Sequence, residues 1–261
     1  MLSRTAENLF WMARDMERAE NTARMLDVSF RMALLPSIID KQALHFEPIL
    51  AIAPGDGRFH ELYGELSHET IIRYVALEPA NPASIWSLIR LARENARAQR
   101  SAISSEAWES LNQTWLQVQK LDFDGLRRWG FRDFFDWIKE RSHLFRGVVF
   151  GTMLHDDAFR FIRLGTFIER ADMPRSLHHC YGVIINTLDE LAGKKQLECR
   201  RLAGQTYARL RYGRLDKIFQ SGLHEFLTDF IAQNNALGTQ LQEDFLMTRA
   251  AVAGAAVAGA A

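Results

Sequence analysis

The sequence has few cysteines, no long apolar run and no targeting signal. Cys180 and Cys199 are its only cysteines among 261 residues, and their spacing fits neither a disulfide framework nor a zinc site. No stretch approaches the roughly 18 consecutive apolar residues of a membrane span. The N-terminus lacks the basic start and apolar core of a signal peptide. We therefore expect a cytoplasmic protein with no membrane partner.

An excess of charge of either sign is also missing. The 32 basic and 32 acidic residues give a formal net charge of zero, so nucleic acid is not an expected partner of the chain as a whole. One local basic patch, residues 194–217, interleaves lysines and arginines with Tyr207 and Tyr212. No phosphate loop, dinucleotide fingerprint or Gly-x-Ser-x-Gly motif is present. The sequence therefore predicts no cofactor.

Proline is rare outside residues 36–82, which we expect to be rich in loops, and none lies in residues 83–173. Because proline breaks a helix interior, its absence permits long helices. Helical periodicity fills these stretches, and strand patterns are absent. The sequence therefore predicts an all-α, multi-helix bundle. The expected helices cover residues 2–30, 60–77, 81–103, 104–121, 131–147, 155–173, 174–192, 196–212 and 215–246.

Local signals predict where several elements begin and end. Asn81 followed by Pro82 is typical of an N-cap and a first helical residue. A break between two helices is expected around Gly147 and Gly151. We expect one α-helical domain over residues 1–247, followed by a low-complexity, disordered tail of residues 248–261.

Two stretches of the sequence resemble each other. They read LFWMARDMERAE at residues 9–20 and FIRLGTFIERAD at residues 161–172, and each ends in Glu-Arg-Ala followed by an acid. They predict an internal pseudo-repeat of one Glu-Arg helix, centred on residues 2–30 and 154–173. Leu154 is expected on the apolar stripe of the second copy.

Each copy places charged groups on more than one side of its helix. On a helical wheel, one carboxylate falls on the apolar stripe, a second at its edge and an arginine on the opposite side. In that order these residues are Glu20, Glu17 and Arg18 in the first copy and Asp172, Glu169 and Arg170 in the second. Because a buried carboxylate needs a partner, the sequence predicts either two cross-helix clamps or one shared polar pocket. A third interpretation leaves the charges solvated.

Two further segments offer groups that could meet these carboxylates. In ARENARAQR, arginines at i, i+4 and i+7 form one basic face that suits a carboxylate or phosphate, and we expect it to pair with Glu17 or Glu169. The stretch ERSHLFRG adds Arg141 and His143 as candidates. The candidate binding residues on these segments are Arg93, Glu94, Asn95, Arg97, Arg100, Arg141 and His143.

A pair of Glu-x-x-His sequences provides a metal-binding alternative. They are Glu65 with His68 and Glu140 with His143. Residues i and i+3 share a helix face, and two such motifs with two more glutamates can build a di-metal carboxylate site. The two edge glutamates of the repeat could complete it. Chance spacing explains the same motifs without a metal.

Four segments together carry a family resemblance. They are MLSRTAENLFWMARDMERAENTARMLD, NPASIWSLIRLARENARAQRSAISSEAWE, ERSHLFRGVVFGTMLHDDAFRFIRLGTFIERADM and LAGQTYARLRYGRLDKIFQSGLHEFLTDF. Over most of residues 1–246 the chain resembles the bacterial alpha-E family, α-helical domains with an ER motif. The resemblance implies a protein that recurs as a partner of circularly permuted ATP-grasp ligases, or is fused to them. The resemblance implies an accessory component of ATP-dependent amide or peptide ligation, with that ligase or its peptide substrate as partner.

The chain departs from the family pattern after the second Glu-Arg helix. In the family that helix continues, and a further segment precedes MPRSLHHC. Here Asp172 runs directly into Met173 and Pro174, and proline disfavours helical geometry in the residue before it. The resemblance therefore implies an internal deletion, so an inactive, truncated paralogue is another reading of the chain.

Overall fold

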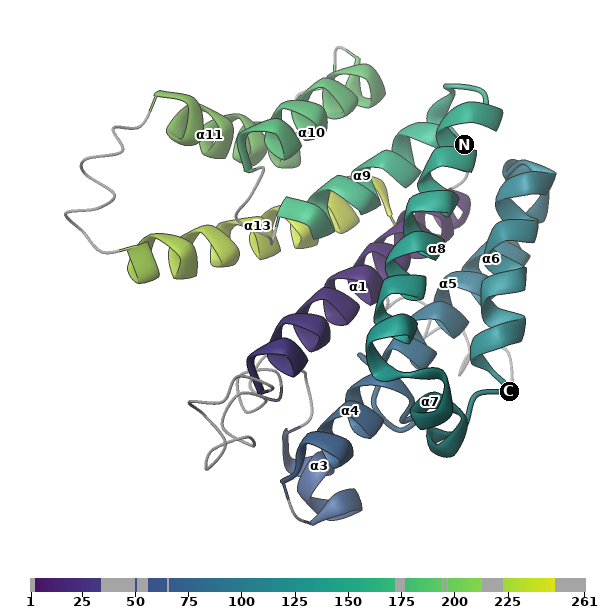
Figure 1. Ribbon diagram of the computed structural model, residues 1–261. Coiled ribbons are helices and arrows are strands. Elements are labelled where there is room, and N and C mark those ends of the chain that lie inside the picture. Colours follow the sequence, from purple (N-terminus) through teal and green to yellow (C-terminus); the bar gives the residue numbers. More distant parts are fainter. Residues whose placement is uncertain are drawn as a thin grey trace, which may run out of the picture. The chain divides into compact units, whose positions relative to one another are not determined.

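The computed structural model shows an all-α protein over the residues that it describes (Figure 1). These are residues 3–33, 50, 56–64, 66–171, 177–193, 195, 197–212 and 223–246. They form eleven α-helices and one short 3-10 helix, with no strand among them. The predicted fold class is therefore confirmed. Within the same ranges, no helix is long and apolar enough to cross a membrane.

The helices pack into two compact units. One unit comprises residues 15–153, and the other joins residues 1–14 to residues 154–261. Helix α1 (Ser3–Ala33) therefore gives its first part to one unit and the rest to the other. A single domain over residues 1–247 stays a prediction, because compactness of each unit does not decide whether both unfold in one step.

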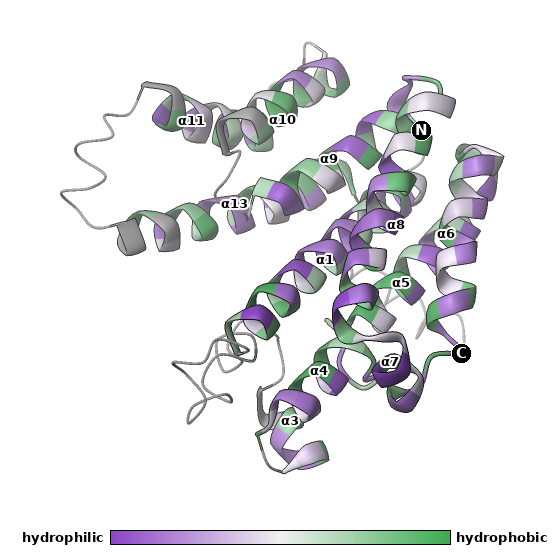
Figure 2. Cartoon of the chain, in the orientation of Figure 1, coloured by the Kyte–Doolittle hydropathy of each residue, from purple (hydrophilic) through white to green (hydrophobic). Residues whose placement is uncertain are grey.

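The unit of residues 15–153 is built on a continuous apolar core. Its α6 (Ser105–Val118) packs against both α5 (Ile85–Ala98) and α8 (Phe131–Thr152) (Figure 1). Phe59, Tyr74, Phe134 and Phe135 are almost completely buried in this core, and Figure 2 shows the mixed apolar and polar faces of the surrounding helices. Its elements are α3 (Asp56–Tyr63), α4 (His68–Ala76), α5 (Ile85–Ala98), η2 (Arg100–Ala102), α6 (Ser105–Val118), α7 (Phe123–Trp129) and α8 (Phe131–Thr152).

In the other unit, the described residues form four helices and the start of α1. They are α9 (Asp157–Ala171), α10 (Leu177–Ala192), α11 (Glu198–Tyr212) and α13 (Leu223–Phe245). Helix α10 packs against α9 and α11, and α13 contacts both of these as well. Buried Asn234 accepts a 2.9 Å hydrogen bond from the Tyr181 hydroxyl and donates one of 3.1 Å to the Ile168 carbonyl. The amide of Asn234 thus satisfies a backbone acceptor near the end of α9.

Helix α9 touches the backbone of α1 at a glycine. A Cβ atom added to Gly165 would lie 2.2 Å from the carbonyl oxygen of Phe10 and 3.2 Å from the backbone nitrogen of Arg14. No side chain fits in that space, so the close approach of the two helices requires glycine.

One predicted helix is divided in the structure. The sequence predicts a single helix over residues 60–77, but α3 ends at Tyr63 and α4 begins at His68. Gly64 adopts a positive φ of 67°, which glycine tolerates and which ends a helix. Ser67 then caps α4 through a capping box with Thr70. The prediction of one helix is wrong because these two local signals outweigh the periodicity.

The predicted start at Pro82 is also wrong. Helix α5 begins three residues later, after the N-cap Ser84, whose side chain accepts from the backbone of Ser87. Asn81 is buried and binds elsewhere, because its amide donates to the carbonyl of Tyr74 at 3.1 Å. Its side-chain oxygen accepts from the backbone of Ala83 at 2.9 Å, which forms a turn ahead of the helix.

The break between helices that was expected around Gly147 and Gly151 lies just after Gly151, because α8 ends at Thr152 and α9 begins at Asp157. Helix α8 runs unbroken through Gly147 to Thr152, since one glycine costs a helix only about 1 kcal/mol. Leu154 follows this helix and precedes α9, and it is 83% exposed. Its predicted place on the apolar stripe of the second copy is therefore wrong.

Several predictions concern residues outside the described ranges. They involve Glu65, Asp172, the Met173–Pro174 junction and the tail of residues 248–261. Both Glu-Arg copies otherwise lie in helices, α1 and α9. The pseudo-repeat itself stays a prediction.

Candidate functional site

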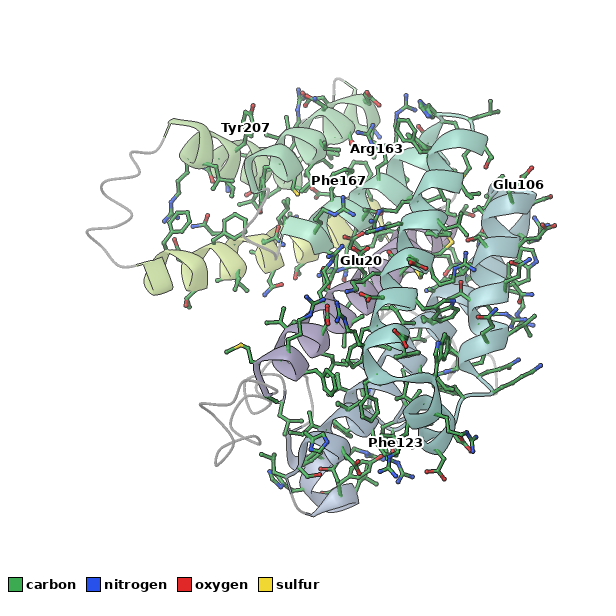
Figure 3. All side chains as sticks on the ribbon, in the orientation of Figure 1. Glu20, Glu106, Phe123, Arg163, Phe167 and Tyr207 are labelled. Atoms are coloured by element: carbon green, nitrogen blue, oxygen red, sulfur yellow. The ribbon has the colours of Figure 1, made fainter. Side chains whose placement is uncertain are left out.

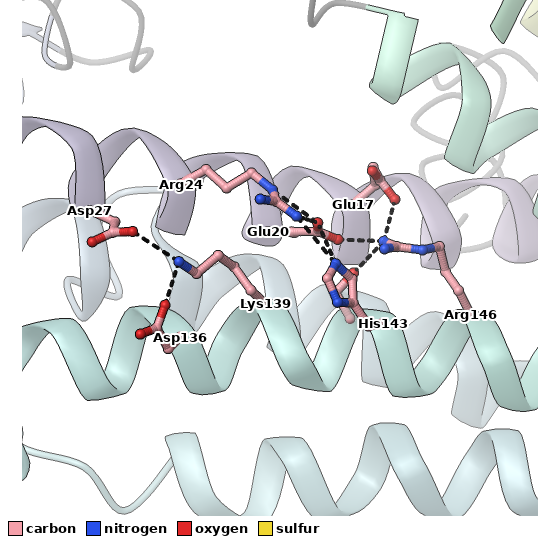
Figure 4. Close-up of polar contacts among 9 residues, drawn as sticks. Glu17, Glu20, Arg24, Asp27, Asp136, Lys139, His143 and Arg146 are labelled. Atoms are coloured by element: carbon pink, nitrogen blue, oxygen red, sulfur yellow. Dashed lines mark hydrogen bonds and ion pairs between the residues drawn. The ribbon is translucent and has the colours of Figure 1, made fainter. Parts of the chain in front are cut away.

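An acidic face of α1 meets a basic face of α8 within the unit of residues 15–153 (Figure 4). Three acidic residues on this face of α1, Glu17, Glu20 and Asp27, are only 2–5% exposed. Figure 3 labels one of them, Glu20, between the two helices. We call this group the α1–α8 cluster. It comprises Glu17, Glu20 and Asp27 on α1 and Lys139, His143 and Arg146 on α8.

Arg146 joins two glutamates at one end of the cluster. Its Nη1 lies 2.8 Å from Oε2 of Glu17 and also donates to Oε2 of Glu20. The other oxygen of Glu20, Oε1, lies 2.5 Å from Nη2 of Arg24 and 3.1 Å from Nε2 of His143. Two buried carboxylates are thus matched by two guanidinium groups, and the outward His143 imidazole is half exposed.

A second set of ion pairs lies further along the same two helices. Nζ of Lys139 lies 2.9 Å from Oδ2 of Asp27 and 2.5 Å from Oδ1 of Asp136. Arg31 Nη2 approaches Asp27 to 2.8 Å. Because charge-assisted hydrogen bonds satisfy each buried carboxylate of the cluster, burial of these groups is compatible with a stable fold.

The cluster holds Glu20 firmly in its ionised form. Burial is the largest single influence and by itself would raise the pKa of this carboxyl. Hydrogen bonds and charge from Arg146, with further hydrogen bonds from Arg24 and Ser142, outweigh burial and lower the pKa to about 2, against an ordinary value of 4.5. A carboxylate with such a pKa is a poor general acid or base near neutral pH.

This lowered pKa makes the free energy of unfolding depend on pH in the acidic range. A depressed pKa contributes stability above pH 4.5 that is lost as the pH falls towards 2. The shift from 4.5 to about 2 corresponds to about 3 kcal/mol, of which about 2 kcal/mol should be gone at pH 3. Urea unfolding at pH 7 and pH 3 should show that this loss is smaller by about 2 kcal/mol in Glu20→Gln than in the wild type.

Glu140 supplies the matched control for this pH effect, because it is an exposed glutamate on α8. Glu140→Gln should keep the pH dependence of the wild type. An equal pH dependence in all three proteins would contradict the assigned role of Glu20.

A second buried ion pair links α1 to α9 within the other unit. Nε of Arg14 lies 2.7 Å from Oε2 of Glu169, and both residues are less than a tenth exposed. The Arg14 guanidinium also lies over the ring of Trp11, 5.2 Å from its centroid. A buried pair with a stacked guanidinium is held in one geometry. Glu169 and Glu17 therefore belong to separate clusters, each with its own arginine.

The arginines of the Glu-Arg dipeptides have other surroundings. Arg18 is partly buried. The guanidinium of Arg170 lies 5.5 Å from the ring centroid of Phe167, which Arg163 approaches from the preceding turn at 5.9 Å. Figure 3 labels Phe167 and Arg163 on α9.

The predicted pairing of the basic face of α5 with Glu17 or Glu169 is wrong. Arg93 and Arg97 both bind Glu94, at 2.5 and 2.8 Å. The observed partners of Glu17 and Glu169 are Arg146 and Arg14. The remaining candidates on α5 and α8, Asn95 and Arg141, are partly buried.

Sequence reasoning missed Arg14 and Arg146, although a spacing signal for Arg146 was present. Glu20 and Asp27 are seven residues apart, and so are Lys139 and Arg146. On two antiparallel helices, equal spacings bring two pairs of groups together at once. Opposite charges at matching intervals could therefore have identified α8 as the partner of α1.

The di-metal alternative gains no support from the described residues. Within their ranges, no group of three or more His, Cys, Asp or Glu side chains is placed to hold a metal ion. Glu140 is exposed, and His68 is the first residue of α4. Glu17 and Glu169, which would complete the site, bind arginines instead.

The basic patch of residues 194–217 is largely neutralised where the structure describes it. Arg200, Arg201 and Arg209 each pair with a carboxylate. In the same order, the partners are Asp189, Glu198 and Asp229. Because such exposed pairs reduce the local positive potential, this patch is a weak candidate for binding an anionic partner.

Comparison with known proteins agrees with the all-α fold and the Glu-Arg dipeptides. A family model named Alpha-E, described as a predicted alpha-helical domain with a conserved ER motif, matches residues 1–173 and 171–246. Neither the curated proteins nor the solved structures gave a match. Glu17-Arg18 and Glu169-Arg170 both lie within the first matched segment. Since the two matches together span residues 1–246, the chain belongs to the Alpha-E family.

Proposed function

We propose that this protein is an accessory, binding component of an ATP-dependent amide or peptide ligation system, and that it works with a circularly permuted ATP-grasp ligase. Two things support the proposal. The resemblance to the Alpha-E family implies such a partner, and the chain belongs to that family. The described Glu-Arg centres are occupied by internal ion pairs.

The internal pairing is the observation on which the non-catalytic role rests. Glu17, Glu20 and Glu169 are buried and bound to arginines. With a pKa of about 2, Glu20 does not exchange protons near neutral pH, where a general acid or base has to work. These groups stabilise helix packing, which leaves the surface of the protein for binding.

A cytoplasmic location belongs to the same proposal. Ligation driven by ATP takes place where ATP is held. Cys180 and Cys199 are both buried, and burial and hydrogen bonding to Asp244 raise the pKa of the Cys199 thiol. Such thiols are unreactive and suit a reducing compartment.

The test is reconstitution with the circularly permuted ATP-grasp ligase encoded in the same genome. We expect the two proteins to co-elute in gel filtration and the chain to change ATP turnover by the ligase about fivefold or more, the lower end of typical coupling between partners. Turnover is measured with a peptide acceptor, with and without the chain.

A heat-denatured sample of the chain serves as the control for this assay. Separate elution together with unchanged turnover would overturn the proposal. Stoichiometric iron, manganese or zinc in the purified chain would favour the di-metal enzyme instead. Thermal melting without a cooperative transition would favour the truncated, inactive paralogue.

A further inference from the structure

Helices α5 and α6 join arginine and tryptophan side chains along their line of contact. On α5, Trp86, Arg90 and Arg93 follow one another at i, i+4 and i+7, and on α6 Trp108 and Trp115 are seven residues apart. Such spacings form one stripe on each helix. We call the two stripes, together with Arg100 of η2, the Arg–Trp seam, which consists of Trp86, Arg90, Arg93, Arg100, Trp108 and Trp115.

At one end of the seam, stacking fixes Arg90. Its guanidinium lies 5.6 Å from the ring centroid of Trp86. Trp86 in turn meets Trp115 edge to face, with centroids 5.1 Å apart. All three side chains are partly buried. A stacked guanidinium loses little further freedom when it binds a ligand.

At the other end of the seam, Trp108 lies next to two arginines. The guanidinium groups of Arg93 and Arg100 are 5.4 and 5.6 Å from its ring centroid. Arg93 also donates from Nε to the side chain of Asn112 at 3.2 Å. Arg100 itself is exposed.

Positive charge on the seam is only partly compensated. Arg93 shares the carboxylate of Glu94 with Arg97. Among the described residues, no carboxylate pairs with Arg90 or with Arg100, whose hydrogen bond goes to the Ser105 hydroxyl at 3.4 Å. Nε of Arg90 is buried without a hydrogen-bond partner. A guanidinium held in this way makes fewer hydrogen bonds than it has donors. A carboxylate at its terminal nitrogens would add charge-assisted hydrogen bonds.

We propose that the Arg–Trp seam binds an extended acidic peptide segment of a partner, with one carboxylate at Arg90 and another at Arg100. From Arg90 to the end of α5 at Ala98 the helix rises about 12 Å, and Arg100 follows in η2. An extended peptide covers that distance in about four to five residues. The surface therefore suits a short segment with acidic residues at both ends, and Arg93 lies between the two anchor points.

The arginines stacked on the tryptophan rings also favour a peptide carboxylate over a nucleic acid as the ligand of the seam. Single-stranded nucleic acids bind by stacking bases on open aromatic faces. Here guanidinium groups lie over the rings of Trp86 and Trp108, so the groups offered to a ligand are N–H donors. The formal net charge of zero gives a long polyanion no general attraction.

The binding test uses acetyl-hexaglutamate amide as the probe and the full chain as the receptor. Tryptophan fluorescence and calorimetry should show saturable binding. Arg90→Met combined with Arg100→Met should weaken it about tenfold or more, because two charge-assisted contacts are lost. Methionine keeps the apolar packing of the arginine stem. Circular dichroism verifies that the variant is folded, and Arg100→Met alone replaces it if it is not.

Arg128→Met combined with Arg132→Met is the matched control. It removes the same amount of positive charge from exposed positions of α7 and α8, outside the Arg–Trp seam. Binding should stay within about twofold of the wild type, because exposed charges contribute little. Absence of saturable binding, an equal loss in the control variant, or tighter binding of a thymidine hexanucleotide would each overturn the proposal. The proposal stands on this surface alone, so its failure would leave the ligase partnership untouched.

Discussion

Arg146→Met is expected to lower the free energy of unfolding by about 3–5 kcal/mol at pH 7, the usual cost of removing one partner from a buried ion pair. The substitution leaves Glu17 and Glu20, which are 3% and 2% exposed, without the guanidinium that joins them. Urea unfolding followed by circular dichroism measures the change. Because acid can neutralise the stranded carboxylates, the difference from the wild type should shrink as the pH falls below about 4.5.

Arg132→Met provides the control on the same helix. The side chain of Arg132 is 61% exposed and comes no closer than 4.0 Å to Asp136. Its loss should therefore change stability by less than about 1 kcal/mol. Adding Glu17→Gln and Glu20→Gln to Arg146→Met should recover part of the stability, since amides are cheaper to bury than carboxylates that have lost an arginine. A loss that is no larger at Arg146 than at Arg132, or that does not depend on pH, would show that the α1–α8 cluster contributes little.

Gly165→Ala is expected to cost about 3 kcal/mol, the upper end of what overpacking usually costs. The new methyl group would meet the backbone of Phe10 at 2.2 Å, and a helix backbone cannot move aside as a flexible side chain can. This cost outweighs the gain of about 1 kcal/mol that alanine brings to a helix interior. Thermal and urea unfolding of the variant measure the balance.

Gly204 is the control for this substitution, because it lies within α11 and no atom is within 4 Å of an added Cβ. Gly204→Ala should therefore raise stability by up to about 1 kcal/mol. If both alanine variants were more stable than the wild type, α9 would not approach α1 as closely as described.

The fold class could be predicted from the sequence because helical periodicity and missing prolines are local signals. Errors arose where two local signals compete. The apolar pattern of residues 60–77 continues across Gly64, and only the positive φ of that residue and the cap at Ser67 divide it. At residue 147 the reverse holds, since glycine alone does not end a helix that α6 packs against.

Burial of the site residues could be predicted, but their partners could not. A helical wheel places Glu20 among apolar side chains, and the residue is indeed buried. The wheel contains no information on which other helix faces it. Arg146 is 126 residues away in sequence, and Arg93 satisfied the same wheel-based argument equally well. Pairing over such separations is decided by the topology of the bundle, which local patterns do not encode.

The long sequence separation between α1 and the residues that pair with it has a consequence for synthesis on the ribosome. The buried charges of α1 are neutralised by Arg146 and Glu169, at sequence separations of 129 and 155 residues from their partners Glu17 and Arg14. At roughly 5–20 residues per second, translation reaches those positions on the order of ten seconds after α1 emerges. During that interval α1 exposes a mixed apolar and charged surface, and such high contact order slows folding. We therefore expect nascent α1 to depend on a chaperone until its partners have been synthesised.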